Sequence, residues 1–180
     1  MAGGIREGYL LHLDAIADNV GDIRYVALEE GVIKFYAAPD RLEAHLMHTT
    51  SLTRHTVEVD IIPFNDGNGL PCRFVVHLTP YSDSSTSRDK EQFLLFSAPT
   101  SAATTLWMKA LLNWHRHSFD TSVRSLPINA EDQAAIDAQR ATDLQQLEER
   151  MQQYDLTPRP PQSHASSTSS IWSWMQSLMS

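Results

Sequence analysis

The sequence predicts a mostly β fold, in which a seven-stranded antiparallel sheet curves into a barrel and one α-helix closes its open end. Two observations lead to this fold class. Seven short runs of alternating or continuous apolar residues lie between residues 7 and 97, and turn-forming residues separate them. One amphipathic run follows Pro99, and its apolar stripe needs a surface to pack on. Closing the sheet would also cover its exposed edges.

The strands follow one another with short connections. Gly31 lies between the second and third, where glycine accepts the positive φ of a tight hairpin. The NDGNG run at 65–69 is a strong turn signal, and a Ser-rich loop at 82–90 separates the last two strands. The predicted strands are 7–13, 23–28, 32–37, 44–49, 56–61, 73–78 and 92–97.

The closing helix is expected to begin after Pro99, with Thr100 or Ser101 as its N-cap, and to run to about His117. Its apolar stripe consists of residues at i, i+3, i+4 and i+7, namely Trp107, Ala110, Leu111 and Trp114. A tryptophan at this spacing is a core residue. Its replacement by alanine should cost about 3–5 kcal/mol.

Residues 5–119 resemble a pleckstrin-homology (PH) domain. The order of the strands, their spacing and the lone helix carry the resemblance more than any single motif. It implies that Trp107 plugs the barrel and that the module recruits proteins to membranes or to other proteins. The matching pieces are Gly8-Tyr9-Leu10, Arg24-Tyr25-Val26-Ala27-Leu28, Val32-Ile33-Lys34-Phe35-Tyr36, Phe74, Phe93-Leu94-Leu95-Phe96-Ser97-Ala98 and Trp107.

The resemblance also implies where a phosphoinositide headgroup would bind, through basic residues on the first two strands. Several converging cations are needed, because one exposed ion pair contributes only about 0.2–1 kcal/mol. In this chain His12 stands where the family has a lysine, and only Arg24 remains of the basic pair in the second strand. Lys34 and Arg41 could assist.

Acidic residues oppose this candidate headgroup site. Asp14, Asp18 and Asp22 lie in or beside the first loop and would repel phosphate. Arg24 could equally be a strand charge paired with Asp22 or Glu7. Weak or pH-dependent binding remains an alternative, with His12 becoming charged in an acidic setting.

Composition and motifs exclude other classes of function. The net charge of −8 argues against a nucleic-acid binder, and no apolar run approaches the length of a membrane span. The single cysteine, Cys72, leaves no internal disulfide and favours a reducing cytoplasmic setting. His45 and His48, like His115 and His117, lack the ligand set of a zinc site. We therefore expect no metal, no cofactor and no enzymatic activity.

The C-terminal third divides into three predicted segments. A helical extension at 128–156 has Asn129 as its cap, and it should pack on the barrel or, alternatively, on a partner's helix. A Pro- and Ser-rich linker follows at 157–170. The apolar stripe of the extension is Leu144, Leu147, Met151 and Tyr154.

The last segment, 171–180, has the pattern of a short amphipathic helix. It would dock on a partner, on its own barrel or on a membrane surface. Its candidate docking residues are Ile171, Trp172, Trp174, Met175, Leu178 and Met179.

Two functional hypotheses follow. The first is a non-enzymatic adaptor or scaffold with unidentified protein partners, which uses the groove beside the closing helix. The alternative is a phosphoinositide-binding module with a peripheral membrane contact.

Overall fold

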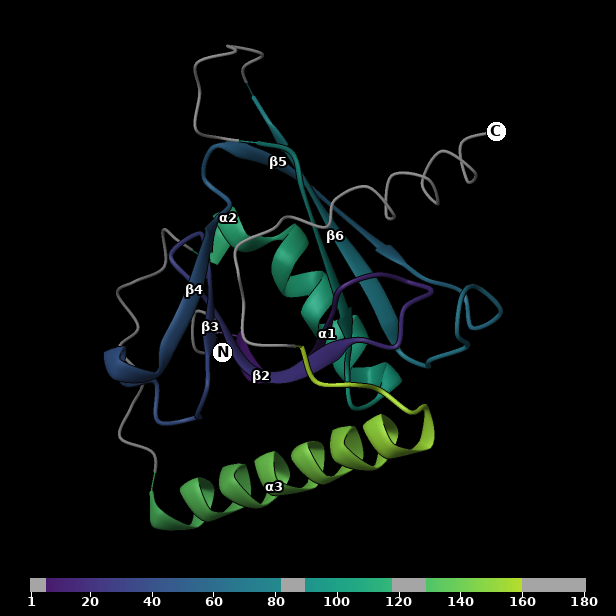
Figure 1. Cartoon of the computed structure of the whole chain (residues 1–180). Coiled ribbons are helices and arrows are strands. Elements are labelled where there is room, and N and C mark those ends of the chain that lie inside the picture. The colour runs from purple at the N-terminus through teal and green to yellow at the C-terminus, as the bar shows by residue number, and fades with distance from the viewer. Residues whose placement is uncertain (1–5, 82–89, 118–128, 160–180) are drawn as a thin grey trace.

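Seven antiparallel strands form one sheet in the order β4-β3-β2-β1-β7-β6-β5 (Figure 1). This computed structural model describes residues 6–81, 90–117 and 129–159. The strands are β1 (Arg6–Leu13), β2 (Gly21–Glu29), β3 (Val32–Tyr36), β4 (Leu46–Ser51), β5 (His55–Ile61), β6 (Arg73–Pro80) and β7 (Gln92–Ser97). The sheet and its C-terminal helix confirm the predicted PH-like architecture.

The register explains how the sheet curves. β1 pairs with β2 along its whole length but with β7 only through Leu11–Leu13, so the sheet bends within β1. In the described residues β4 pairs only with β3 and β5 only with β6. The barrel is therefore open between β4 and β5, and the predicted closure of its edges is wrong on this side.

Most predicted strand limits lie close to the observed ones, and the largest difference is in the fourth strand. A single 3-10 turn, η1 (Glu43–His45), replaces the predicted beginning of this strand. The His45 N–H donates to the Leu42 carbonyl at 2.9 Å, which bends the chain before β4 begins at Leu46.

The closing helix is divided into α1 (Ser101–Leu112) and α2 (Trp114–His117), where one helix was predicted. The Thr100 hydroxyl caps α1 by accepting a hydrogen bond from the Ala103 N–H at 3.1 Å. At the other end, the Asn113 side-chain amide donates to the Lys109 carbonyl at 2.8 Å. This side chain competes for a helical carbonyl and ends α1.

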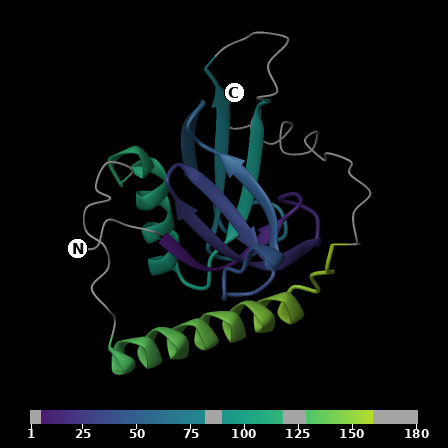
Figure 2. The same ribbon diagram turned by 90° about the vertical axis from the view of Figure 1, so that its left-hand side faces the viewer.

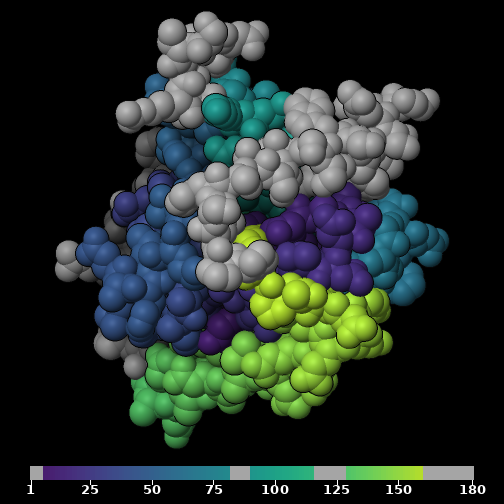
Figure 3. Space-filling model, viewed as in Figure 1, coloured from purple at the N-terminus to yellow at the C-terminus, as the bar shows by residue number. Residues whose placement is uncertain are grey.

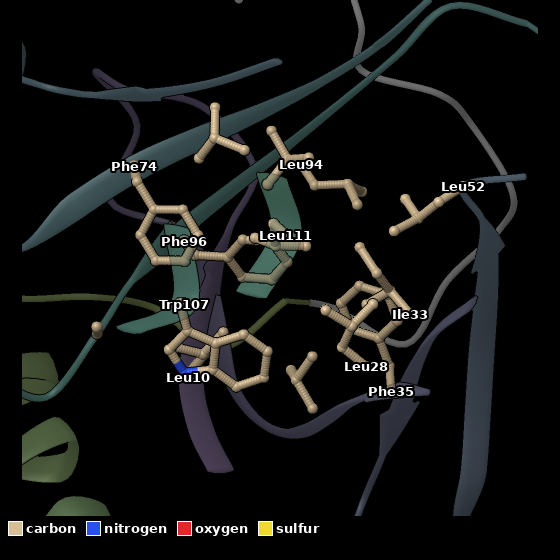
Figure 4. Packing of buried hydrophobic residues seen from close by; sticks show 14 of the residues in the cluster. Leu10, Leu28, Ile33, Phe35, Leu52, Phe74, Leu94, Phe96, Trp107 and Leu111 are labelled. Atoms are coloured by element: carbon tan, nitrogen blue, oxygen red, sulfur yellow. The ribbon is translucent and has the colours of Figure 1, made fainter. Parts of the chain in front are cut away.

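Trp107 is central to the inner core, the apolar cluster between the sheet and α1 (Figure 4). Its side chain is only 2 % exposed, and the guanidinium of Arg6 lies 5.4 Å from its ring centroid. The inner core also contains Leu10, Val26, Leu28, Ile33, Phe35, Leu52, Val59, Phe74, Val76, Leu78, Leu94, Phe96, Ala98 and Leu111.

A third helix, α3 (Ala130–Gln153), crosses the opposite face of the sheet from α1 (Figure 2). Asn129 caps it as predicted, accepting the Asp132 N–H at 2.8 Å. Leu147 is 0 % exposed, so α3 packs on the barrel of its own chain. The apolar residues between the barrel and α3 form a second cluster, here called the outer core. It consists of Leu11, Leu13, Ile16, Ile62, Leu70, Val75, Leu95, Leu147 and Leu156.

Arg150 fixes α3 against the junction between β7 and α1. Its guanidinium donates to the Ser97 hydroxyl at 2.9 Å, to the Pro99 carbonyl at 2.8 Å and to the Ala98 carbonyl. Burial lowers the pKa of Arg150 from its ordinary value. These bonds tie α3 to the segment that leads from β7 into α1.

Candidate functional site

The four cations of the candidate headgroup site lie in two groups. His12 and Arg24 belong to β1 and β2 near the first loop, which we define as residues 14–20. Lys34 and Arg41 instead meet at Glu29, where β2 ends. The structure does not bring the four side chains to one point, and their role in binding a headgroup stays a prediction.

Arg24 is paired within its own strand. Its Nη2 lies 2.9 Å from Oδ2 of Asp22, a carboxylate that is largely buried. Residues two apart in a strand share a face, which is why the sequence could suggest this pair. An arginine that is already paired with a carboxylate contributes less free energy to binding a phosphate, because the existing ion pair must first be broken.

Lys34 and Arg41 share one carboxylate. Lys34 Nζ lies 3.0 Å from Glu29 Oε1, and Arg41 donates to both Glu29 oxygens at 2.7 Å. Burial alone would raise the pKa of Glu29, but hydrogen bonds from both cations lower it. Glu7 extends the network to α3, since it accepts from Arg41 at 3.0 Å and from Arg140 at 2.6 Å.

His12 lies among aromatic rings on the inner side of β1. Its ring centroid is 5.2 Å from that of Phe35 and 5.3 Å from that of Phe96. Burial lowers the pKa of His12 to about 3, and the positive charges of Arg159 and Arg24 add to the effect. Such a ring stays neutral in mildly acidic conditions, which argues against a pH-dependent role of His12 in binding a headgroup.

The charged group at the first loop includes residues that the sequence analysis did not select. The side chain of Arg159 donates from Nε to Oδ1 of Asp14 at 2.7 Å. The backbone N–H of Arg159 donates to Oδ1 of Asp22 at 3.1 Å. The predicted linker thus begins with residues bound to the barrel, because Arg159 satisfies two acidic residues there. No sequence signal pairs residues so distant. The excess of aspartate in the first loop does, however, indicate that a basic side chain from another part of the chain lies near it.

A second candidate surface lies beside α1, which packs against β5. The side chains of Leu106 and Leu112 are 49 % and 45 % exposed. The backbone of β5 has a ladder partner on one edge only, among the described residues. Exposed apolar side chains and an unpaired strand edge are each features of protein-contact surfaces.

Residues 6–81, 90–117 and 129–159 contain no group of three or more His, Cys, Asp or Glu side chains that could hold a metal ion. None of the helices within them has both the length and the apolar character needed to cross a bilayer. The predicted docking segment at 171–180 lies outside the described residues.

No family model matches this chain, and no curated protein does. Several solved PH domains resemble its structure. The Slm1 PH domain in complex with D-myo-inositol 4-phosphate has a TM-score of 0.46 at 17% identity, over 60% of this chain and 94% of that one. The human KIAA0053 PH domain has a TM-score of 0.46 at 19% identity, over 66% and 91%. The N-terminal PH domain of human ARAP2 has 0.42 at 15%, over 72% and 92%. The fold assignment rests on the strand order and register above, not on these scores.

Proposed function

We propose that this chain is a non-catalytic recognition module that works through protein contacts and has lost tight phosphoinositide binding. One observation supports this choice most strongly. Arg24, Lys34 and Arg41 each pair with a carboxylate of the same chain at 2.7–3.0 Å. A headgroup would have to displace these carboxylates, and it would leave them without their cations.

The neutral His12 ring supports the same proposal. A histidine with a pKa of about 3 supplies no positive charge for a phosphate at neutral pH. The first loop adds the carboxylates Asp14 and Asp18, and Asp22 follows it. Three carboxylates therefore face the two guanidinium groups of Arg24 and Arg159 at this end of the barrel, and this charge does not favour an anion.

The surface beside α1 is the proposed protein contact. Leu106 and Leu112 are about half exposed, and burying the exposed part of each side chain against a partner contributes about 0.7–1.5 kcal/mol. The free edge of β5 can add main-chain hydrogen bonds.

Sedimentation with liposomes tests the loss of headgroup binding. The full chain is mixed with vesicles of phosphatidylcholine alone, or with a bis- or trisphosphorylated phosphoinositide added. We expect equal, low binding to both, and no change in Arg24→Ala or in the control Lys109→Ala. Strong phosphoinositide binding that Arg24→Ala abolishes would overturn the proposal.

The protein contact is tested by affinity capture with matched variants. We expect a specific set of proteins to bind the wild type and Gln145→Asp, whose change lies on an exposed position of α3. The same proteins should be lost with the Leu106→Asp/Leu112→Asp pair. Identical capture by all three chains would remove the α1 surface from the proposal.

A further inference from the structure

The four residues Leu156–Arg159, here named the strap, lie along the first loop as a bound peptide lies on its receptor (Figure 3). Thr157 forms a parallel bridge with Val20. Its N–H donates to the Asn19 carbonyl at 2.7 Å, and its carbonyl accepts the Gly21 N–H at 3.1 Å. Main-chain pairing of this kind gives affinity without regard to sequence.

Leu156 is the apolar anchor of the strap. After α3, Asp155 takes a positive φ of 53°, and the Leu156 N–H donates to the Met151 carbonyl at 2.8 Å. This helix ending turns the chain back toward the barrel. The Leu156 side chain, 7 % exposed, enters the outer core together with Ile16 and Leu70.

Arg159 is the charged anchor. Its guanidinium pairs with Asp14 through Nε at 2.7 Å and also through Nη2. Its backbone N–H is held by Asp22, whose other oxygen accepts from Arg24. Asp14 therefore favours a cationic side chain three residues after the buried leucine, while Asp22 holds the backbone at that position.

The first loop is held in shape by contacts that do not involve the strap. Arg73, a buried side chain of β6, donates to the Ile16 carbonyl at 3.4 Å, and Asn68 donates to the Asn19 side chain at 3.1 Å. Gly67 approaches the same carbonyl so closely that a Cβ there would lie 2.4 Å from it. The loop is thus preorganised from its far side, which lowers the cost of binding a peptide.

We propose that the first loop is a docking site for extended peptide segments with a leucine and an arginine three residues apart, and that the strap occupies it in the absence of a partner. A partner segment with this pattern binds by exchange with the strap. The proposal adds a second protein contact to the proposed function and does not depend on the α1 surface.

The test uses the full chain and the peptide QYDLTPR, which has the sequence of residues 153–159. Amide signals of the first loop are followed by NMR in the wild type and in the opened variant Leu156→Asp/Arg159→Ala. We expect saturable shifts at Val20, Gly21 and Asp22 in the opened variant. Binding to the wild type should be weaker by on the order of tenfold or more, because the tethered strap competes.

The control peptide carries Leu156→Asp and Arg159→Glu and should produce no shifts. If the opened variant keeps the signal dispersion of a folded protein but shows no saturable shift, the proposal of a docking site is wrong. Equal shifts with the control peptide also contradict the proposal.

A second variant covers the case in which the opened chain does not fold. Arg159→Ala keeps the buried leucine, so the fold should persist while the strap loosens. We expect faster hydrogen exchange of the Gly21 amide than in the wild type or in Lys109→Ala, and added peptide should slow it again. Unchanged exchange overturns the proposal. Neither experiment contains lipid or other proteins, so its failure leaves the results for the proposed function standing.

Discussion

Single residues determine both the stability of the inner core and the charge at the first loop. Trp107 contacts the sheet and is 2 % exposed, whereas Leu106 beside it in α1 is 49 % exposed. Adjacent positions of one helix therefore offer a matched pair of substitutions.

Trp107→Ala should lower the free energy of unfolding by about 3–5 kcal/mol, because it removes a large buried side chain and leaves a cavity. Leu106→Ala should change it by no more than about 0.5 kcal/mol. Urea denaturation of both variants measures the difference. Equal effects of the two substitutions would mean that Trp107 does not plug the barrel.

The pH dependence of stability should depend on His12. Its pKa in the folded chain, about 3, is far below the value of about 6.5 in an unfolded chain, so the unfolded chain binds the additional proton as the pH falls. Stability due to this residue is therefore complete above pH 6.5 and is lost progressively toward pH 3. The slope is up to about 1.4 kcal/mol per pH unit.

Denaturation curves from pH 7 to pH 4 measure this slope. His12→Gln cannot titrate and should flatten the curve relative to the wild type. If the two curves are parallel, His12 is not held neutral by its surroundings.

Sequence reasoning identified residues that act through local periodicity and missed those that act across the fold. Trp107 follows from helical spacing, and the Arg24–Asp22 pair from the two-residue period of a strand. The Arg159–Asp14 pair joins residues 145 positions apart, and no local pattern encodes it. The aromatic rings around His12 come from β3 and β7, so its low pKa also required the fold.

At the scale of elements, α3 explains why the central strands are apolar on both faces. In β1 and β7 consecutive residues belong alternately to the inner and outer cores: Leu10 with Leu11, and Leu94 with Leu95. An antiparallel sheet with one wet face would alternate apolar and polar residues instead. The continuous runs in these strands were therefore a signal for a second covering helix.

Leu147→Ala should destabilise the chain by about 2–5 kcal/mol, since the side chain is fully buried against the sheet. Gln145→Ala, on an exposed position of the same helix, is the matched control and should be nearly neutral. Thermal unfolding followed by circular dichroism reports both. Near-neutral Leu147→Ala would mean that α3 is not packed on the barrel in solution.

At the scale of the whole molecule, the sheet together with α1 and α3 forms the packed unit. A chain ending at residue 119 would expose outer-core residues such as Leu11, Leu13 and Leu95. Such a contiguous apolar surface destabilises a monomer and promotes association.

The 1–119 chain should therefore bind a hydrophobic dye and unfold at lower denaturant than the full chain. A 1–170 chain retains every described residue and should match the full chain in both measurements. A stable, monomeric 1–119 domain would contradict the two-sided core.

The overall topology could be predicted because strands, turns and a closing helix leave local patterns. The open side between β4 and β5 could not be predicted. These are the two end strands of the sheet, and whether they pair depends on the curvature of the completed sheet. The docking of α3 was one of two alternatives, and only the buried Leu147 decided between them.

The central claim is that the cations near the first two strands are committed to carboxylates of the chain itself. An NMR titration of the full chain with a soluble inositol polyphosphate measures this directly through the guanidinium signals of Arg24 and Arg41. The account predicts that these signals keep their positions as the ligand is added. Saturable shifts of both signals, together with release of Asp22 and Glu29 from their partners, would contradict it.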